Sequence, residues 1–432
     1  MKDQKYKNSI LELSLILNEL QKPIQILDSI KWPEGTDEFI IKNKFKEIPT
    51  IAYDNRPLKY VPQKKLQEFK ELRLKISREL GDRDPLGMIL ARNCGQYEDV
   101  VRMLMSRGKS DFYDYSKKLY GSPSEIMADG KSTLADLAGI ISNLLNTLDK
   151  KDLGNNFERI LTSEDVVVDL KNRLSHYFLD EKIKVKLSDG ILSDASAGSD
   201  YIKIRSELMF AKKDVDIFEV HEGWVHLGTT LNGQSQPYAK WLAKGPPCST
   251  VTQEGLAVTM ELFTFSMFPK RAKRLNDRLV ACHMAEEGAD LLQVINFFKN
   301  KGQEDRQAIK NASRIFRGAP LTGGSPFTKD ISYLKGFVMI YNFMRMCIKE
   351  GNSDLIPFLF AGKVTLDELP LLKRFHDEGV ISMPKYLPPM IKDMNGLGVW
   401  MAFSNFLNTM NLSDILKEQS SSEDKNPFKK AA

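Results

Sequence analysis

Two histidines and a glutamate lie together in the segment HEGWVH at 221–226. The chain has only 5 histidines in all, so this segment holds a concentration of them. Neutral imidazole is a common zinc ligand, and a carboxylate beside the bound metal can take a proton from an attacking water. His221, Glu222 and His226 therefore indicate the chemistry of a zinc hydrolase.

The spacing of the two histidines places a demand on the helix that carries them. Residues four apart on an α-helix lie about 40° apart around the axis, as the common H-E-x-x-H motif requires, whereas residues five apart lie about 140° apart. His221 and His226 can therefore share a metal only if the helix is locally widened, as in a π-bulge. Gly223 would ease that distortion. We predict a π-helical turn within 219–228.

A third ligand is expected in the segment QEGLA at 253–257. A catalytic zinc takes three protein ligands and keeps one position open for water, and Glu254 is the leading candidate for the third. The small residues Gly255 and Ala257 would let this helix pack closely on the metal-binding helix. Glu222 would then be free to act as the base. The alternative is that Glu254 is a first-turn glutamate that complements the helix dipole.

These segments, in this order, resemble a known family. Together with FRG at 316–318 and PFTKDISYLKG at 326–336, they look like the flavohaemoglobin expression-modulating QEGLA-motif proteins. The eukaryotic relatives of that family are the microtubule-associated tyrosine carboxypeptidases, which remove the C-terminal tyrosine of α-tubulin. The resemblance covers residues 180–340 clearly.

The resemblance implies a zinc metallocarboxypeptidase that acts on the C-terminus of a peptide or protein. Its implied cofactor is Zn²⁺, held by His221, His226 and Glu254, and its implied general base is Glu222. The tubulin enzymes have small or aliphatic residues before the second histidine, where this chain has the bulky Trp224. The accepted C-terminal residue, tyrosine or another aromatic, is therefore left open.

A carboxypeptidase must also recognise a free carboxylate. Arginine does so through a bidentate fork and lysine as a point charge. In the segment shared with the family, we expect Arg317 first and Lys329 second to bind the substrate. Tyr333 is expected to donate to the oxyanion, with a core position as the alternative. Asp330 is expected to cap the following helix or to orient a metal ligand.

The elements that must position these residues are mostly helical. Apolar periodicity predicts N-terminal helices over 8–30, 63–80, 84–93, 97–107, 110–119, 131–149 and 163–174, with an irregular stretch over 31–62. It predicts later helices over 214–231, 252–267, 271–298, 303–316, 330–350, 366–377 and 396–416. Alternating residues predict two short strands at 182–187 and 201–205, separated by a small polar loop at 194–200. The edge of such a sheet can hold an extended peptide by strand addition.

We therefore predict a predominantly helical α+β protein with a small sheet and a zinc-metallopeptidase-like catalytic domain. The expected division is an N-terminal, mostly helical region over 1–160, a catalytic domain over 161–416 and a disordered tail over 417–432.

Composition limits the class of partner and the compartment. A hydrophobic content of 42%, a charged content of 28% and a net charge of +5 are typical of a globular protein and give no sign of a nucleic-acid binder. Four scattered cysteines fit buried thiols in a reducing compartment. There is no signal peptide or long apolar run, so we expect a cytoplasmic protein without a membrane partner. The oligomeric state is left open.

Three alternatives stay open from the sequence. H-E-x-x-x-H also resembles the dipeptidyl peptidase III helix, so a zinc dipeptidyl-peptidase or aminopeptidase is one of them. A regulatory metal-binding protein with a closed site is another. The third is a scaffold that binds no metal, in which the histidines are core residues.

Overall fold

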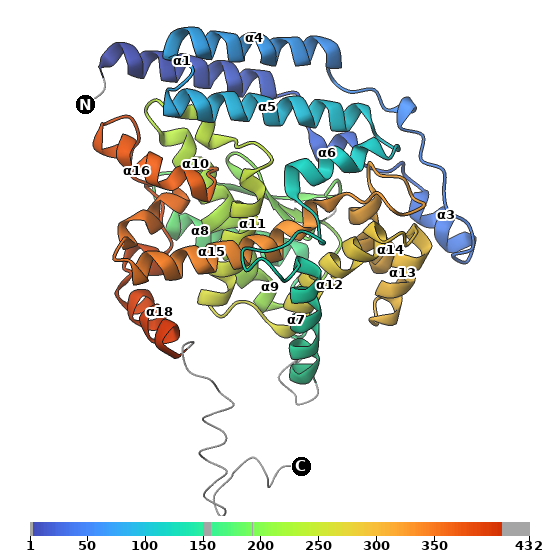
Figure 1. Cartoon of the computed structure of the whole chain (residues 1–432). Coiled ribbons are helices and arrows are strands. Elements are labelled where there is room, and N and C mark those ends of the chain that lie inside the picture. The colour runs from blue at the N-terminus through green and yellow to red at the C-terminus, as the bar shows by residue number, and fades with distance from the viewer. Residues whose placement is uncertain (1–2, 150–156, 192, 408–432) are drawn as a thin grey trace, which may run out of the picture.

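The computed structural model describes residues 3–149, 157–191 and 193–407 (Figure 1). These residues are predominantly helical and contain one small sheet, as the sequence predicts, but the sheet has three strands where two were predicted. The predicted tail at 417–432 lies outside the described residues. No helix in the described ranges is long and apolar enough to cross a membrane.

The elements before the sheet are helical and run as follows: α1 (Gln4–Gln21), α2 (Ile26–Ser29), α3 (Thr36–Lys42), the 3-10 turn η1 (Tyr53–Asn55), α4 (Pro62–Leu80), α5 (Pro85–Met105), α6 (Asp111–Tyr120), α7 (Leu134–Asp149) and α8 (Ser163–Tyr177). The sheet consists of β1 (Lys184–Ser188), β2 (Ala195–Ala197) and β3 (Tyr201–Arg205).

The elements after the sheet are again helical: α9 (Lys212–Ile217), the π-helix η2 (Phe218–Leu227), α10 (Gly228–Ser235), η3 (Lys240–Ala243), α11 (Ser249–Phe263), α12 (Pro269–Glu286), α13 (Leu291–Asn300), α14 (Asp305–Phe316), η4 (Thr328–Ile331), α15 (Ser332–Lys349), η5 (Ser353–Phe360), η6 (Leu366–Glu368), α16 (Leu369–Asp377), α17 (Pro389–Lys392) and α18 (Asn395–Leu407).

Two helix predictions were wrong in how they divided the chain. The helices predicted at 84–93 and 97–107 form the single helix α5, because one internal residue such as Gly95 costs a helix only about 1 kcal/mol and tertiary packing outweighs it. The helix predicted at 271–298 is two helices. Gly288 breaks it with a φ of +103°, and the Asp290 side chain caps the start of α13.

The N-terminal helices α1, α4 and α5 pack together as a layer at one end of the molecule (Figure 1). α1 buries Ile10, Leu13 and Leu17 along one stripe, at the spacing of a helix face. These side chains belong to the same hydrophobic cluster as Trp241 and Met260, which lie near the centre of the chain's later helices. The N-terminal layer therefore shares its core with the rest of the molecule.

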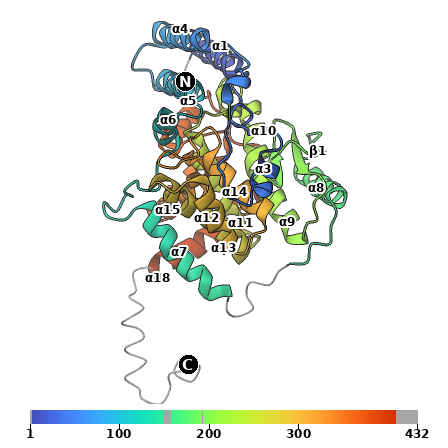
Figure 2. The same cartoon turned by 90° about the vertical axis from the view of Figure 1, so that its right-hand side faces the viewer.

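The sheet lies on one flank with α8, as the side view shows (Figure 2). Its strand order is β1-β3-β2, with β1 parallel and β2 antiparallel to β3. The two predicted strands are confirmed as β1 and β3, and β3 buries Ile202 and Ile204 in a cluster shared with α8 and η2. β2 falls within the predicted loop, because three residues are too few to show an alternating pattern. As an edge strand, β2 borders the π-helix.

The helices α11 and α15 cross with their backbones in contact. A Cβ on Gly255 would lie 2.1 Å from the carbonyl carbon of Gly336, and a Cβ on Gly336 would lie 2.0 Å from the Val251 carbonyl oxygen. Glycine at both positions is what permits the crossing. Gly255 was expected to pack against the metal-binding helix, but its close contact is with Gly336 of α15.

Candidate active site

The helix that carries both histidines is π-helical over Phe218–Leu227, which confirms the predicted widening. The rings of His221 and His226 lie edge to face with their centroids 4.7 Å apart. A regular α-helix would point them about 140° apart. Gly223 lets α8 approach this turn, because a Cβ there would lie 2.6 Å from Leu174 Cδ2.

Glu254 reaches toward both rings from α11. Its Oε2 lies 3.6 Å from His221 Nε2 and 3.5 Å from His226 Nε2. That oxygen is buried and has no hydrogen-bond partner. Two imidazole nitrogens and a carboxylate oxygen that converge in this way form the ligand set of a catalytic zinc, so these residues fit the ion.

The charge on Glu254 is fixed by its surroundings. Burial opposes its ionisation, but Lys329 and the two histidines hold its pKa well below the usual range. Lys329 Nζ donates to Glu254 Oε1 at 3.0 Å, which leaves Oε2 for the histidines. Glu254 lies in the second turn of α11, beyond the first-turn position that the dipole alternative requires.

A buried carboxylate that the sequence analysis missed orients His221. His221 Nδ1 lies 2.6 Å from Glu261 Oε1, and Glu261 also accepts from Arg271 Nη2 at 2.9 Å and Nε at 3.2 Å. Burial opposes ionisation of Glu261, but Arg271 and His221 lower its pKa to about 2. A carboxylate can only accept, so Nδ1 carries a proton toward Glu261, and Nε2 is the nitrogen left to offer a lone pair to a metal once it loses its own proton.

Without a metal, His221 itself holds a proton tightly. Burial works against protonation, but the carboxylates of Glu254 and Glu261, one beside each ring nitrogen, raise its pKa to about 9. The signal for Glu261 was present in the sequence, because it lies seven residues after Glu254. That spacing places both carboxylates on one face of a helix.

Glu222 lies beside the histidines and faces the sheet. Its Oε2 accepts a hydrogen bond of 2.8 Å from the backbone N–H of Ala197, in the edge strand β2. It also lines a small cavity of about 60 Å³, together with His221 and Tyr333. The ring centroids of Tyr333 and His221 are 6.3 Å apart. The predicted base and the predicted oxyanion donor are therefore brought to one space.

The predicted carboxylate-binding residues are placed differently from each other. Lys329 lies next to the three candidate metal ligands, because its ammonium is hydrogen-bonded to Glu254. Arg317 is buried beside the Phe327 ring, 5.6 Å from its centroid, and is absent from the residues that line the cavity. Burial and the charge of Arg314 lower the pKa of Arg317 to about 10.

Asp330 takes neither of its expected roles. It accepts from Arg314 Nε at 2.5 Å and Nη2 at 3.0 Å, and α15 has no side-chain cap. Both predictions for Asp330 were wrong, because its carboxylate forms an ion pair with Arg314 of α14. The residue that orients a histidine is Glu261 instead.

The cavity is rich in basic side chains that the sequence analysis did not single out. Five basic side chains line it, namely Arg271, Arg274, Arg278, Lys310 and Arg314. Three acidic side chains line it as well, namely Asp194, Asp214 and Glu222. The three arginines of α12 recur at helical spacing, so they form a stripe that is visible in the sequence.

The cations of this cavity outnumber the carboxylates that they pair with, since Arg278 and Arg314 also share one partner, Asp330. Arg274 and Lys310 share Asp194 at 3.5 Å each, and the Nε atoms of Arg274 and Arg278 are buried without a hydrogen-bond partner. Burial and the charge of Arg314 lower the pKa of Arg278 to about 9. Burial lowers the pKa of Lys310 to about 8 although Asp194 opposes the change. The arrangement is suited to an added anion.

The cavity continues into a groove of about 940 Å³ that shares Arg271, Arg274 and Lys310 with it. Further basic side chains line the groove, namely Arg159, Arg205, Lys270, Lys273, Lys301 and Arg306. Trp224, where the chain departs from the tubulin enzymes, lies elsewhere: it stacks on Tyr177 with ring centroids 5.5 Å apart.

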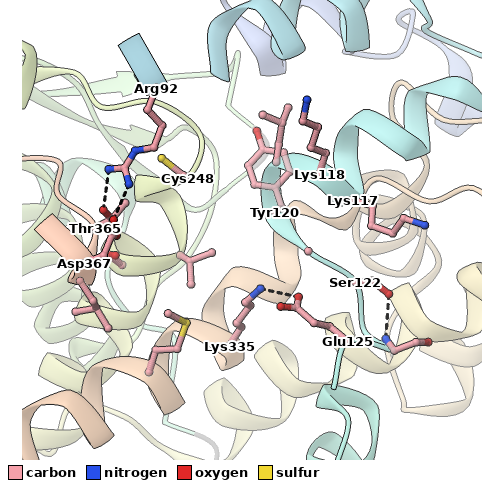
Figure 3. Close-up of a pocket in the computed structure, with 17 residues that line it drawn as sticks. Arg92, Lys117, Lys118, Tyr120, Ser122, Glu125, Cys248, Lys335, Thr365 and Asp367 are labelled. Carbon is pink, nitrogen blue, oxygen red and sulfur yellow. Dashed lines mark hydrogen bonds and ion pairs between the residues drawn. The ribbon is translucent and has the colours of Figure 1, made fainter. Parts of the chain in front are cut away.

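A separate cavity of about 790 Å³ is lined mainly by α6 and the loop after it, α11 and α15, with Arg92 of α5 at its edge (Figure 3). Cys248, just before α11, lines it beside Arg92, whose guanidinium is bonded to Asp367 and Thr365. Burial raises the pKa of Cys248 to about 12, so its thiol stays protonated at neutral pH. The other three cysteines are buried and free, in agreement with the expected thiols.

The remaining histidines lie outside the site. His283 lies close to Glu286 and Glu287. The Glu286 carboxylate already accepts hydrogen bonds from the hydroxyls of Ser122 at 2.5 Å and Ser124 at 2.6 Å, so we assign no metal there. The other two histidines are bonded to backbone carbonyls, as expected for surface or core residues: His176 on α8 and His376 on α16.

Comparisons with known proteins agree with the resemblance to the tyrosine carboxypeptidases. A family model described as microtubule-associated tyrosine carboxypeptidase matches residues 37–409. No curated protein matches the chain. A crystal structure of a putative lipoprotein from Colwellia psychrerythraea is distantly similar, with 12% identity, a TM-score of 0.43, and coverage of 74% of this chain and 70% of that chain.

Proposed function

The chain belongs to the microtubule-associated tyrosine carboxypeptidase family, and we propose that it is a zinc metallocarboxypeptidase that removes a C-terminal residue from a peptide or protein. His221, His226 and Glu254 would hold the zinc ion, and Glu222 would act as the base. The residue removed is tyrosine or another aromatic, in line with the family.

The observation that supports the carboxypeptidase direction is the positive charge of the cavity beside Glu222. A substrate carboxylate placed there would supply the hydrogen-bond acceptor that the buried Nε atoms of Arg278 and Arg274 lack. An aminopeptidase needs the opposite, an anionic pocket for a free ammonium group, so this cavity disfavours that alternative. We therefore assign carboxylate binding to Arg278 and Arg274, ahead of Arg317.

The roles of the chain's own groups follow from their positions. Zinc, when bound, would polarise the scissile carbonyl and lower the pKa of a bound water. Glu222 would take the proton from the attacking water and return it to the leaving amine. Tyr333 would donate its hydroxyl to the carbonyl oxygen as charge develops there. Lys329 would keep Glu254 oriented toward the histidines through their hydrogen bond. This role would be additional to the binding of the substrate carboxylate expected from the sequence.

The experiment compares two N-blocked dipeptides ending in tyrosine, one with a free C-terminus and one amidated. We expect zinc-dependent hydrolysis of the free form and none of the amide, because only the free form carries the carboxylate. Arg278→Met should lower kcat/KM by about 10- to 100-fold, the value of a charge-assisted hydrogen bond. Hydrolysis of both forms at equal rates would contradict the proposed direction of attack.

Metal analysis accompanies that assay. The wild type should carry close to one zinc ion per chain, and the variant with His221→Ala and His226→Ala should carry none. A wild type that binds zinc but cleaves neither peptide would favour the regulatory metal-binding alternative.

A further inference from the structure

One lysine connects the segments that surround the metal cluster. The backbone N–H of Lys363, in the loop after η5, donates to the Leu242 carbonyl at 2.7 Å and so fixes the loop to η3. Its ammonium donates to the His226 carbonyl at 2.8 Å, the Thr229 hydroxyl at 2.9 Å and Gln253 Oε1 at 3.0 Å. These three acceptors can use all three N–H bonds of the ammonium group.

The carbonyls at this place belong to the junction between the π-helix and α10. Where the hydrogen-bond spacing changes from five residues to four, the regular backbone ladder is interrupted. The Val225 carbonyl accepts there from the backbone N–H of Gly228, and side chains add further donors. The Val225 carbonyl accepts from Thr229 Oγ1 at 2.6 Å, and the His226 carbonyl accepts from Thr230 Oγ1 at 2.8 Å as well as from Lys363.

Gln253 joins this junction to the helix that carries the third ligand. Its Oε1 accepts from Lys363 and lies 2.8 Å from Thr229 Oγ1, which shares its single proton with the Val225 carbonyl, and its Nε2 donates to the Gly362 carbonyl at 3.3 Å. Gln253 directly precedes Glu254 in α11. The network therefore ties the backbone of His226 to the backbone of Glu254, which gives the first residue of the QEGLA segment a physical role.

We propose that Lys363 is a positioning residue of the metal centre. Its ammonium stabilises the π-to-α junction and thereby holds the His226 ring toward Glu254. Without that ammonium the widened turn relaxes toward α-helical spacing, which separates the His226 ring from the His221 ring. The inference rests on the proposed function only in taking His221, His226 and Glu254 as metal ligands.

The test uses Lys363→Met, which keeps the length of the side chain and removes its donors. We expect the dissociation constant for zinc, measured by competition with a chelator, to rise about 10- to 100-fold, as for other residues that orient ligands. The visible spectrum of the cobalt-loaded protein should change. Backbone amides of 218–230 should exchange faster in the metal-free protein. Lys363→Arg, which keeps donors, should restore part of the affinity.

Lys244→Met is the matched control. Lys244 Nζ also donates to a backbone carbonyl, that of Gln21 at 3.2 Å, but at the N-terminal layer. It should leave the zinc affinity and the exchange of 218–230 unchanged. A Lys363→Met protein with wild-type affinity, spectrum and exchange would overturn the proposal.

Two further outcomes are decisive. If Lys363→Met does not fold, Thr229→Val removes one hydroxyl of the same network at nearly constant volume and is judged by the same three measurements. If the wild type binds no zinc, the proposed function fails. Amide exchange of the metal-free variants then still decides whether Lys363 stabilises the junction.

Discussion

Glu222, Glu254 and Glu261 have the same side chain, and their neighbours give them different tasks. Glu254 faces both histidine rings, and its second oxygen is occupied by a lysine. Glu261 is buried against His221 and an arginine, so its role is to orient the ring. Glu222 accepts one backbone hydrogen bond from β2 and borders the cavity, which leaves it able to exchange a proton with a water.

We predict that Glu222→Gln lowers kcat by about 10²- to 10⁴-fold, the usual contribution of a general base. Zinc content should stay at the wild-type level, because Glu222 is not in the ligand cluster. The measurement is peptide turnover together with metal analysis. Glu219→Gln, on the same helix and paired with Arg173, is the control and should keep its turnover. Near-normal kcat in the Glu222 variant would remove it as the base.

We predict that Glu261→Gln weakens zinc binding by about 10- to 100-fold, because the amide no longer holds the His221 ring through a charged hydrogen bond. The change also leaves Arg271 without its carboxylate partner. Glu368→Gln is the matched control, since Glu368 is a buried acid paired with Arg92 away from the metal cluster. Competition with a chelator measures the zinc affinity of both variants. If the Glu261→Gln protein binds zinc as tightly as the Glu368→Gln control, Glu261 does not support the site.

At the scale of elements, two local features set the ligand geometry. The π-helix turns two histidines that are five residues apart toward one point. The glycine contact sets how closely α11, the helix of Glu254, can approach α15. The π-helix could be predicted because the motif spacing demands it. The crossing could not, because Gly255 gives no sign that its partner Gly336 lies in a helix far along the chain.

We predict that Gly336→Ala destabilises the fold by about 1–3 kcal/mol, the usual cost of overpacking, and also lowers zinc affinity. The added Cβ meets the Val251 carbonyl, so α11 and α15 must move apart, and a shift of α11 displaces Glu254. Gly95→Ala in α5 is the control, since nothing lies within 4 Å of its added Cβ. Thermal unfolding should show the control at or above wild-type stability. A stable Gly336 variant would mean that the crossing adapts.

At the scale of the molecule, charge is gathered where the overall composition does not show it. The net charge of +5 is small, yet the cavity and the groove beside the site collect basic residues from α12, α14 and the sheet. A field of this kind attracts anionic substrates and orients their C-terminal end. The helices α12 and α14 that carry most of these residues share one hydrophobic cluster, to which Leu279 and Ile315 belong.

We predict that kcat/KM for a peptide with a free C-terminus falls as the pH rises through about 8. Burial lowers the pKa of Lys310 to about 8, so its side chain is cationic below that pH and neutral above it. Since kcat/KM reports the free enzyme, a pH–rate profile measures the loss. Lys310→Met should show no fall there, because the arginines of the cavity keep their charge. A flat wild-type profile over this range would argue against a contribution of Lys310 to carboxylate binding.

The sequence by itself determined the chemistry and the local geometry it requires. The residue types at 221–226 and 253–257 indicated the ligands, and their spacing required the widened helix, because helical periodicity is a local property of the chain. It did not determine which charges face the substrate. Arg317 looked the better candidate in the sequence, but only packing could bury it and place Arg278 on the cavity. Burial and contacts between distant segments, such as Lys363 with His226, depend on how the whole chain is arranged in space.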